Sequence, residues 1–330
     1  MRLLIIGGTQ FVGRHIAEIA LERGHQVSVF HRGKTNADAV PEAEHILGDR
    51  DHDLENLADG HWDATIDVCA YVPRQVDQLA EALGERGGRH VFISTVSVYA
   101  EPSPPNSDED APLAGLDDPS TEVVDGETYG GLKVLCEGAV AEHYTDAIVI
   151  RPTYVVGPHD YTHRFTYWVN RIAGGGRVLA PNIPDYGIQV IDGRDQARWI
   201  LELLERGESG TFHTVSPPPP FTFADMLRTI VGAVGPAGTE IVAVDPAFLI
   251  QHGVGNSDLP LWYPSAEPDP GMNCSPARAV AHGFATRSLT DTVRETLAHE
   301  RSTPTPNPDG TGWSREREAE VLAAWDARSV

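Results

Sequence analysis

The sequence predicts an α/β fold, in which a doubly wound parallel sheet is joined to a smaller, mixed α/β domain toward the C-terminus. Over the first 100 residues, short β-branched runs alternate with longer helical patterns, which is typical of βαβ units with a buried parallel sheet. A glycine-rich turn at residues 7–13 directly follows the first of these runs. Beyond residue 152 the alternation weakens, and glycine and proline clusters separate shorter elements, which indicates a second domain.

The elements follow from the period of the apolar residues. Strands are expected at residues 3–6, 26–30, 43–47, 64–68, 90–94 and 147–151. Helices are expected at 14–23 and 75–86, where apolar residues share one face, and from Tyr129 onward. Residues 101–127 are rich in Pro, Ser and Asp and predict an exposed loop. A strand at 188–191, a helix at 195–206 and a terminal helix at 315–327 complete the pattern.

These elements divide the chain into domains. A glycine-rich turn between the first strand and the first helix of a βαβ unit is typical of dinucleotide-binding domains. We therefore expect residues 1–152 to form a Rossmann domain that binds NAD(P), with residues 186–208 returning to it. Residues 153–185 and 209–300, which include the irregular stretch 258–271, are expected to form a substrate-binding domain. Residues 301–330 are expected to be a linker and a C-terminal helix.

The composition of the chain restricts the classes of molecule that the protein can bind. The net charge of −23 argues against nucleic acid and anionic membranes, because phosphate contacts require basic patches. No apolar run is long enough to span a membrane, and three scattered cysteines are typical of reduced thiols. The sequence therefore predicts a soluble, cytoplasmic protein with a small-molecule substrate, and a homodimer is possible.

The turn Gly7-Gly8-Thr9-Gln10-Phe11-Val12-Gly13 predicts a dinucleotide site. Glycines allow the backbone to approach a pyrophosphate, and the following helix N-terminus offers free N–H groups and a positive dipole end. The expected pyrophosphate contacts come from Gly7, Thr9, Gln10, Phe11, Val12 and Gly13. Gln10 stands where the middle glycine of the usual motif would be.

The end of the second strand indicates which dinucleotide binds. The strand ends in His31, Arg32 and Lys34 with no carboxylate, and basic residues at this position accommodate the 2′-phosphate of NADP. We therefore expect NADP as the cofactor, with NAD as second choice. After the third strand, Asp49 is expected to bind the adenine amino group, with Arg50 beside it.

Three residues predict proton-transfer chemistry. Tyr129 and Lys133 are four residues apart and share a helix face. The lysine would stabilise a phenolate and so lower the tyrosine pKa, which makes Tyr129 a general acid/base. Thr95, after the fifth strand, can hydrogen-bond the same substrate oxygen. Gly130 and Gly131 weaken this helix, which suggests that another segment passes close to its backbone.

Together, these motifs resemble the extended short-chain dehydrogenase/reductase superfamily, in its NAD-dependent epimerase/dehydratase family. The matching segments are the turn, Asp49, residues 94–99, residues 129–133 and residues 151–158. The resemblance implies that Tyr129 is the acid/base, that Lys133 also holds the nicotinamide ribose, and that Thr95 assists. It further places near the cofactor Ala70, Tyr71, Pro152 and Val155.

The sequence departs from this family in ways that restrict the reaction. Val96 and Ser97 replace the Asp-Glu pair of sugar-nucleotide 4,6-dehydratases, which disfavours elimination, and Thr153 and Tyr154 replace the asparagine of sugar-nucleotide epimerases. The candidate substrate contacts are Thr95, Ser97, Tyr154, Arg164 and Arg194, with Arg171 and Arg177 in the same region. His159 and His163 lack a third ligand, and we expect no metal.

The sequence thus predicts an NADP(H)-dependent oxidoreductase or epimerase that acts on a polar, hydroxylated molecule, such as a sugar-like compound or a secondary metabolite. Reduction and epimerisation both remain open. The alternative is a non-catalytic NAD(P)-binding regulatory or RNA-associated protein of the same fold, against which the intact Thr95, Tyr129 and Lys133 and the acidic charge argue.

Overall fold

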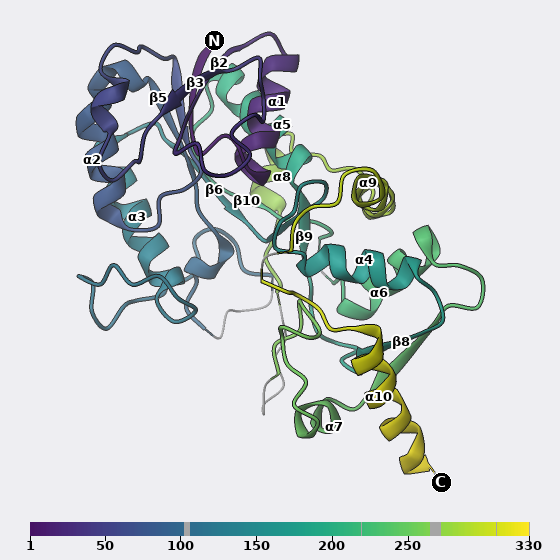
Figure 1. Cartoon of the computed structure of the whole chain (residues 1–330). Coiled ribbons are helices and arrows are strands. Elements are labelled where there is room, and N and C mark those ends of the chain that lie inside the picture. The colour runs from purple at the N-terminus through teal and green to yellow at the C-terminus, as the bar shows by residue number, and fades with distance from the viewer. Residues whose placement is uncertain (102–105, 219, 265–271, 308, 330) are drawn as a thin grey trace. The chain divides into compact units, whose positions relative to one another are not determined.

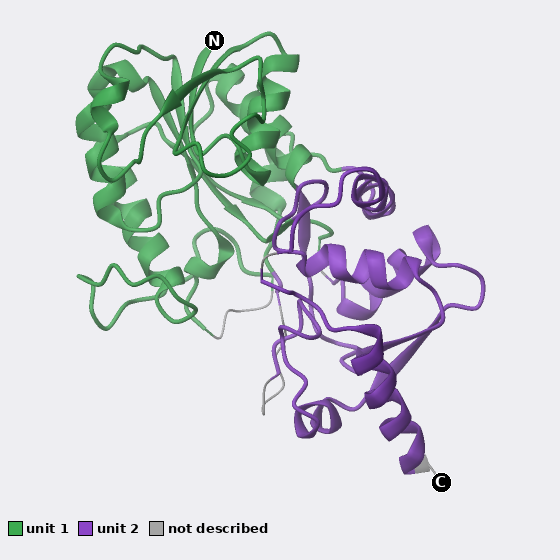
Figure 2. Ribbon diagram, viewed as in Figure 1, with its two compact units in different colours: residues 1–155, 193–218, 274–286 green, residues 156–192, 219–273, 287–330 purple. Residues whose placement is uncertain are grey.

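The computed structural model describes residues 1–101, 106–218, 220–264, 272–307 and 309–329, which divide into two compact units (Figures 1 and 2). Unit 1 consists of residues 1–155, 193–218 and 274–286, and unit 2 of residues 156–192, 219–273 and 287–330. Part of the acidic loop, residues 102–105, and half of the stretch 258–271, residues 265–271, lie outside the described residues.

Among the described residues of unit 1, seven parallel strands form one sheet in the order β3-β2-β1-β4-β5-β6-β10. The strands are β1 (Arg2–Ile6), β2 (Gln26–His31), β3 (Glu44–Leu47), β4 (Ala64–Asp67), β5 (Arg89–Ile93), β6 (Ile148–Pro152) and β10 (Gly210–Thr214). The first six follow the order of the doubly wound dinucleotide-binding fold, in which ligands bind where the order reverses, here between β1 and β4. The predicted fold class is confirmed.

Helices cover both faces of this sheet (Figure 1). On one face α1 (Phe11–Glu22) packs against α5 (Gly193–Arg206), and on the other α2 (Pro73–Leu83) packs against α3 (Tyr129–His143). The central strand is therefore fully buried at Leu3, Leu4 and Ile5, because a parallel sheet with both faces covered must be apolar throughout. A short helix, α8 (Ala277–Ala281), contacts β10.

All six predicted strands of the sheet are confirmed to within one residue at either end. The seventh, β10, is not among the predicted strands, and its residues fall in the segment assigned to the substrate-binding domain. It pairs with β6 and places Phe212, His213 and Thr214 in the interior. The strand expected at 188–191 forms as β9 (Val190–Asp192), but it pairs with β7 (Tyr154–Val156) and does not join the large sheet. The helix after it, α5, belongs to unit 1.

Unit 2 has a core of aromatic side chains beneath α4. Its elements are α4 (Arg164–Ala173), β8 (Arg177–Pro181), β9, α6 (Phe223–Val234), β11 (Glu240–Val244), α7 (Pro246–Gln251), α9 (Leu289–Ser302) and α10 (Arg315–Asp326). Trp168 of α4 is fully buried and lies edge-on to Phe223 of α6. In the part of the chain that the structure describes, no helix combines the length and apolarity needed to cross a membrane.

Two arginines considered for the substrate are used within unit 2. Arg171 is buried, and its Nε lies 2.6 Å from Oε2 of Glu318 on α10. Arg177 forms a bidentate ion pair with Asp326, with N–O distances of 2.6 and 2.8 Å. Both guanidinium groups therefore hold the C-terminal helix against the rest of unit 2 and have a carboxylate partner within the protein.

Candidate active site

Unit 1 contains a pocket of about 280 Å³ at the carboxyl ends of β1, β2, β3 and β4. This is the edge at which doubly wound sheets bind ligands. Nine of the residues predicted to bind the cofactor line it, namely Gly7, Thr9, Gln10, His31, Arg32, Lys34, Asp49, Arg50 and Tyr71. Cys69 and Gln75 also line the pocket and are not among the predicted residues.

The glycine turn fits a dinucleotide pyrophosphate. Gly7 has φ of +92°, a conformation that favours glycine. A Cβ atom at Gly13 would lie 2.3 Å from the Gly7 carbonyl oxygen, so only glycine lets α1 begin this close to the turn. Gln10 makes no side-chain capping hydrogen bond, and the first turn of α1 contains no acidic residue. The first turn of α1 therefore brings no carboxylate of its own to the positive end of the helix dipole, which favours a bound anion there.

Phe11 holds the turn in an unusual conformation. Its φ is +38°, in the left-handed region, although it is not a glycine, and its side chain is buried. Such backbone conformations cost roughly 1–3 kcal/mol and persist where the surrounding packing enforces them, often at ligand sites. The buried ring therefore fixes a turn that lacks the usual middle glycine.

The positive end of the pocket comes from Arg32 and Lys34. Both side chains are exposed, both line the pocket, and neither forms an ion pair with any described residue. An exposed cation pair without a protein counter-charge is suited to a phosphate.

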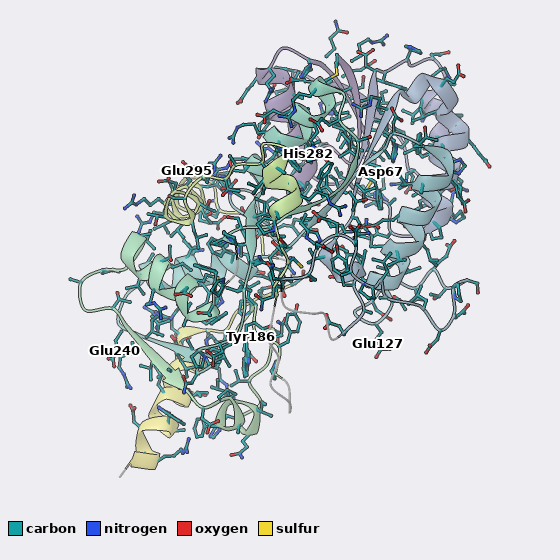
Figure 3. The ribbon with its side chains drawn as sticks, turned by 180° about the vertical axis from the view of Figure 1, so that it is seen from behind. Asp67, Glu127, Tyr186, Glu240, His282 and Glu295 are labelled. Carbon is teal, nitrogen blue, oxygen red and sulfur yellow. The ribbon has the colours of Figure 1, made fainter. Side chains whose placement is uncertain are left out.

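A buried ion pair closes the floor of the pocket. Arg50 is bidentate to Asp67, with N–O distances of 2.7 and 2.9 Å, and also donates to the Gln75 carbonyl. Figure 3 shows Asp67 among the strands of unit 1. The Arg50 guanidinium lowers the pKa of Asp67 despite its complete burial. Arg50 lines the pocket, and its guanidinium is held in place by Asp67 and Gln75.

Lys133 connects the end of β5 to the segment that follows β4. Its Nζ donates to the carbonyl oxygens of Ala70 and Ile93, at 2.9 and 2.7 Å. Burial lowers its pKa to about 8. The same Nζ lies 5.7 Å from the ring centroid of Tyr71, and the rings of Tyr71 and Tyr129 are 6.4 Å apart. Tyr71 also lines the pocket, so it lies between the predicted cofactor site and the predicted catalytic residues Tyr129 and Lys133.

The loop after β5 and the start of α3 touch because of glycine. Thr95 is buried, and its Oγ1 accepts the Ser97 N–H at 3.1 Å. A Cβ atom at Gly130 would lie 2.2 Å from the Ser97 carbonyl oxygen, and one at Gly131 would lie 2.4 Å from Leu116 Cγ. These close approaches confirm the prediction that other segments pass near this helix, and they bring the Thr95 loop against the residue after Tyr129.

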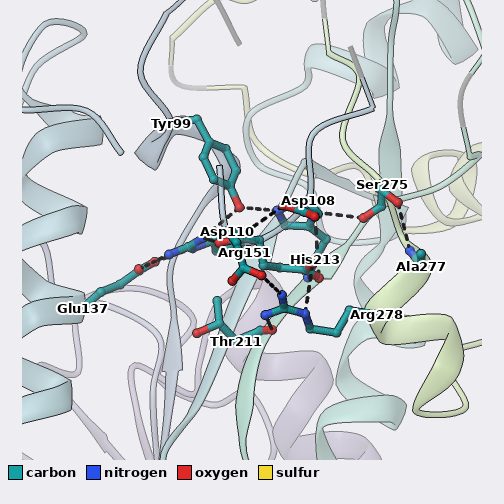
Figure 4. A network of polar contacts seen from close by, with 11 residues as sticks. Tyr99, Asp108, Asp110, Glu137, Arg151, Thr211, His213, Ser275, Ala277 and Arg278 are labelled. Carbon is teal, nitrogen blue, oxygen red and sulfur yellow. Dashed lines mark hydrogen bonds and ion pairs between the residues drawn. The ribbon is translucent and has the colours of Figure 1, made fainter. Parts of the chain in front are cut away.

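A buried polar network holds α3 against the sheet (Figure 4). Glu137, two turns beyond Tyr129 on α3, accepts a hydrogen bond from Ser94 at 2.5 Å and two from Arg151 at 3.0 and 2.6 Å. Arg151 also donates to the Tyr99 hydroxyl at 2.8 Å, and Tyr99 contacts His213 of β10. The network thus ties the helix of Tyr129 and Lys133 to β5, β6 and β10.

The other predicted site residues lie outside the pocket lining. In unit 1, Phe11, Val12 and Gly13 form the start of α1, Ala70 is buried, Ser97 is exposed, and Pro152, Tyr154, Val155 and Arg194 lie on β6, β7 and α5. Arg164 is in unit 2, at the first position of α4. His163 Nε2 donates to the Thr305 carbonyl at 2.9 Å.

Comparison with known proteins agrees with this architecture. The model of the NAD dependent epimerase/dehydratase family matches residues 3–215. The chloroplast stem-loop binding protein of 41 kDa b of Arabidopsis thaliana is 26% identical over 264 residues, which cover 74% of this chain and 66% of that protein. The match therefore spans slightly less than two thirds of the relative.

Solved structures share the fold. WbmG of Bordetella bronchiseptica, in complex with NAD and UDP, superposes with a TM-score of 0.70 at 18% identity, over 93% of this chain and 97% of that one. UDP-glucose 4-epimerase of Thermotoga maritima, with UDP-glucose, gives a TM-score of 0.70 at 17% identity, over 92% and 99%. The family match contains the glycine turn, the pocket and the segment from Thr95 to Lys133. The chain belongs to the NAD-dependent epimerase/dehydratase family, within the extended short-chain dehydrogenase/reductase superfamily.

Proposed function

We propose that this protein is an NADP(H)-dependent oxidoreductase or epimerase that acts on a hydroxyl-bearing or carbonyl carbon of a polar small molecule. The observation that carries the proposal is the position of Tyr71. It lines the pocket at the glycine turn, and it lies within 6.4 Å of the Tyr129 ring and 5.7 Å of the Lys133 ammonium, measured to ring centroids. One continuous site would therefore hold both a dinucleotide and an acid/base group.

The residues divide the chemistry between them. A bound nicotinamide would supply the hydride acceptor or donor. Tyr129 moves the proton at the substrate oxygen, and Lys133 stabilises the phenolate by its charge. Thr95 holds the same oxygen by a hydrogen bond. The pKa of Lys133, lowered to about 8 by burial, leaves it mostly charged at neutral pH.

We propose NADP over NAD because Arg32 and Lys34 line the pocket without ion-pair partners among the described residues, and no carboxylate follows them directly.

The proposal for the substrate class rests on the solved structures that share the fold. WbmG was solved with UDP and the Thermotoga epimerase with UDP-glucose, so nucleotide sugars are the first class to assay.

A panel of nucleotide sugars and simple hydroxylated compounds, assayed with NADP⁺ and NADPH by nicotinamide absorbance and by product analysis, tests the proposal. Tyr129→Phe should lose at least about 100-fold in turnover, because positioned acid/base groups contribute this much, and should still bind the cofactor. Tyr144→Phe, at the residue that directly follows the same helix, is the matched control and should stay active. Equal activity of both variants would contradict the assigned role of Tyr129.

The second candidate is a non-catalytic NAD(P)-binding or RNA-associated protein. The similarity to a chloroplast stem-loop binding protein favours it, whereas the charge of −23 disfavours it. Salt-dependent binding of a stem-loop RNA by both the native chain and Tyr129→Phe, with no turnover on any substrate, would select this candidate.

A further inference from the structure

Two histidines lie side by side beneath the positive end of the pocket. His31 ends β2 and His45 lies on the neighbouring β3, and His31 Nε2 is 2.8 Å from His45 Nδ1. The Gly33 N–H donates to His31 Nδ1 at 3.1 Å, and His45 Nε2 contacts the Val40 carbonyl oxygen at 3.1 Å. His31 is buried, and it lines the pocket whereas His45 does not.

Only one arrangement of protons satisfies all three contacts. Because Nδ1 of His31 accepts the Gly33 N–H, its proton must be on Nε2, which donates to His45 Nδ1. His45 then carries its proton on Nε2 and donates to the Val40 carbonyl. Both rings are neutral in this arrangement, since a second proton on either ring would set one N–H against another. Burial, followed by the neighbouring His45, lowers the pKa of His31, which agrees with a neutral pair.

The pair fixes the backbone that carries the two cations. Gly33 stands between Arg32 and Lys34 and has φ of +67°, so the turn depends on a conformation that glycine adopts readily. Its amide is held by the buried His31 ring. Arg32 and Lys34 are exposed and have no ion-pair partner among the described residues, so the direction in which they leave the backbone is set by this turn.

We propose that His31 and His45 are positioning residues that determine the preference for a dinucleotide bearing a 2′-phosphate. The proposal rests on the proposed function. His31 holds the Gly33 amide, His45 keeps His31 in the tautomer that can do so, and the turn then presents Arg32 and Lys34 to the phosphate. The contribution of the pair is geometric, because neither neutral ring attracts an anion by charge.

The experiment measures the dissociation constants of NADPH and NADH by nicotinamide fluorescence, at a pH well above 6.5, with the full chain and five variants. His31→Ala loses the acceptor for Gly33. His45→Phe loses the acceptor for His31 Nε2–H. Each should lower the ratio of NADPH to NADH affinity by about threefold to tenfold, the effect of one net hydrogen bond. His61→Ala, at an exposed position outside the pocket lining, is the matched control and should leave the ratio unchanged.

A conservative replacement separates the holding of the turn from other roles. An asparagine side-chain oxygen can accept the N–H two residues ahead, so His31→Asn should restore the preference to within about twofold. The asparagine does not need His45 to accept the Gly33 N–H. The double variant His31→Asn/His45→Phe should therefore have the same ratio of NADPH to NADH affinity as His31→Asn. Circular dichroism checks that each variant is folded.

The possible outcomes are distinct. If the native chain prefers NADPH and neither His31→Ala nor His45→Phe changes the ratio, the inference is overturned and the proposed function stands. The same conclusion follows if His31→Asn behaves as His31→Ala, because the imidazole would then act by more than holding Gly33. If the native chain binds neither dinucleotide, the proposed function and the inference both fail.

Discussion

The substitution Gly130→Ala should move α3 away from the loop that contains Thr95. Gly130 lies in the first turn of α3, next to Tyr129, and a Cβ atom there would stand 2.2 Å from the Ser97 carbonyl oxygen. An ordinary carbon–oxygen contact is about 3.3 Å. Gly130→Ala would therefore push α3 from the Thr95 loop by about 1 Å.

The magnitude follows from two opposing effects. Overpacking costs roughly 1–3 kcal/mol and occasionally more, and the upper end applies because the obstructing atom is backbone. Alanine in a helix interior gains about 1 kcal/mol over glycine. The free energy of unfolding should thus fall by about 2 kcal/mol. Gly138→Ala, in the same helix, meets no described atom within 4 Å and should raise stability by up to about 1 kcal/mol.

Urea denaturation of the native chain and both variants measures this difference. The same change, glycine to alanine on one helix, is expected to have opposite signs at the two positions. If Gly130→Ala were as stable as Gly138→Ala, the close contact with Ser97 would not exist, and the two predicted catalytic segments would not be held together in this way.

Two further predictions concern buried polar groups. Neither ring nitrogen of His90 has a partner among the described residues, and burial lowers its pKa to about 4. Unfolded chains protonate this histidine first as pH falls from 6.5, so stability is lost between about pH 6.5 and 4, by about 3 kcal/mol. His90→Phe should remove this part of the acid sensitivity in urea titrations at several pH values, and an unchanged pH profile would refute the assignment. Glu137→Met leaves Arg151 buried without its carboxylate, which should cost roughly 3–5 kcal/mol. Adding Arg151→Met should recover much of that loss, and a double variant less stable than the single one would contradict the pairing.

The sequence predicts the sheet well because its strands carry a local signal. β1 is a continuous apolar run from Leu3 to Ile6, as burial on both faces requires. The other five predicted strands each contain two or three apolar residues between turn residues. β10 escapes prediction because its residues are Gly-Thr-Phe-His-Thr, which has no strong apolar pattern. His213 and Thr214 are buried because partners distant in sequence satisfy them: Glu109 accepts the His213 N–H, and Gln196 accepts from Thr214.

The residues of the candidate site likewise fall into those that a local sequence signal predicts and those that it does not. The glycine turn and the cations after β2 are predictable because one short segment contains the whole physical requirement. The Arg50–Asp67 pair and the carbonyl partners of Lys133 are not, since they depend on which strand ends become neighbours in the sheet. Asp67 ends β4, and only the strand order places β4 next to β1 and thus at the pocket.

The central claim is that the pocket at the glycine turn binds a nicotinamide dinucleotide. Calorimetric titration of the full chain with NADPH and with NADH tests it most directly, with Gly13→Ala as the matched variant, because its Cβ would lie 2.3 Å from the Gly7 carbonyl oxygen. The native chain should bind one dinucleotide per chain, NADPH more tightly than NADH, and Gly13→Ala should lose binding of both. Absence of binding heat with either dinucleotide at several temperatures, or equal binding by Gly13→Ala, would contradict the claim.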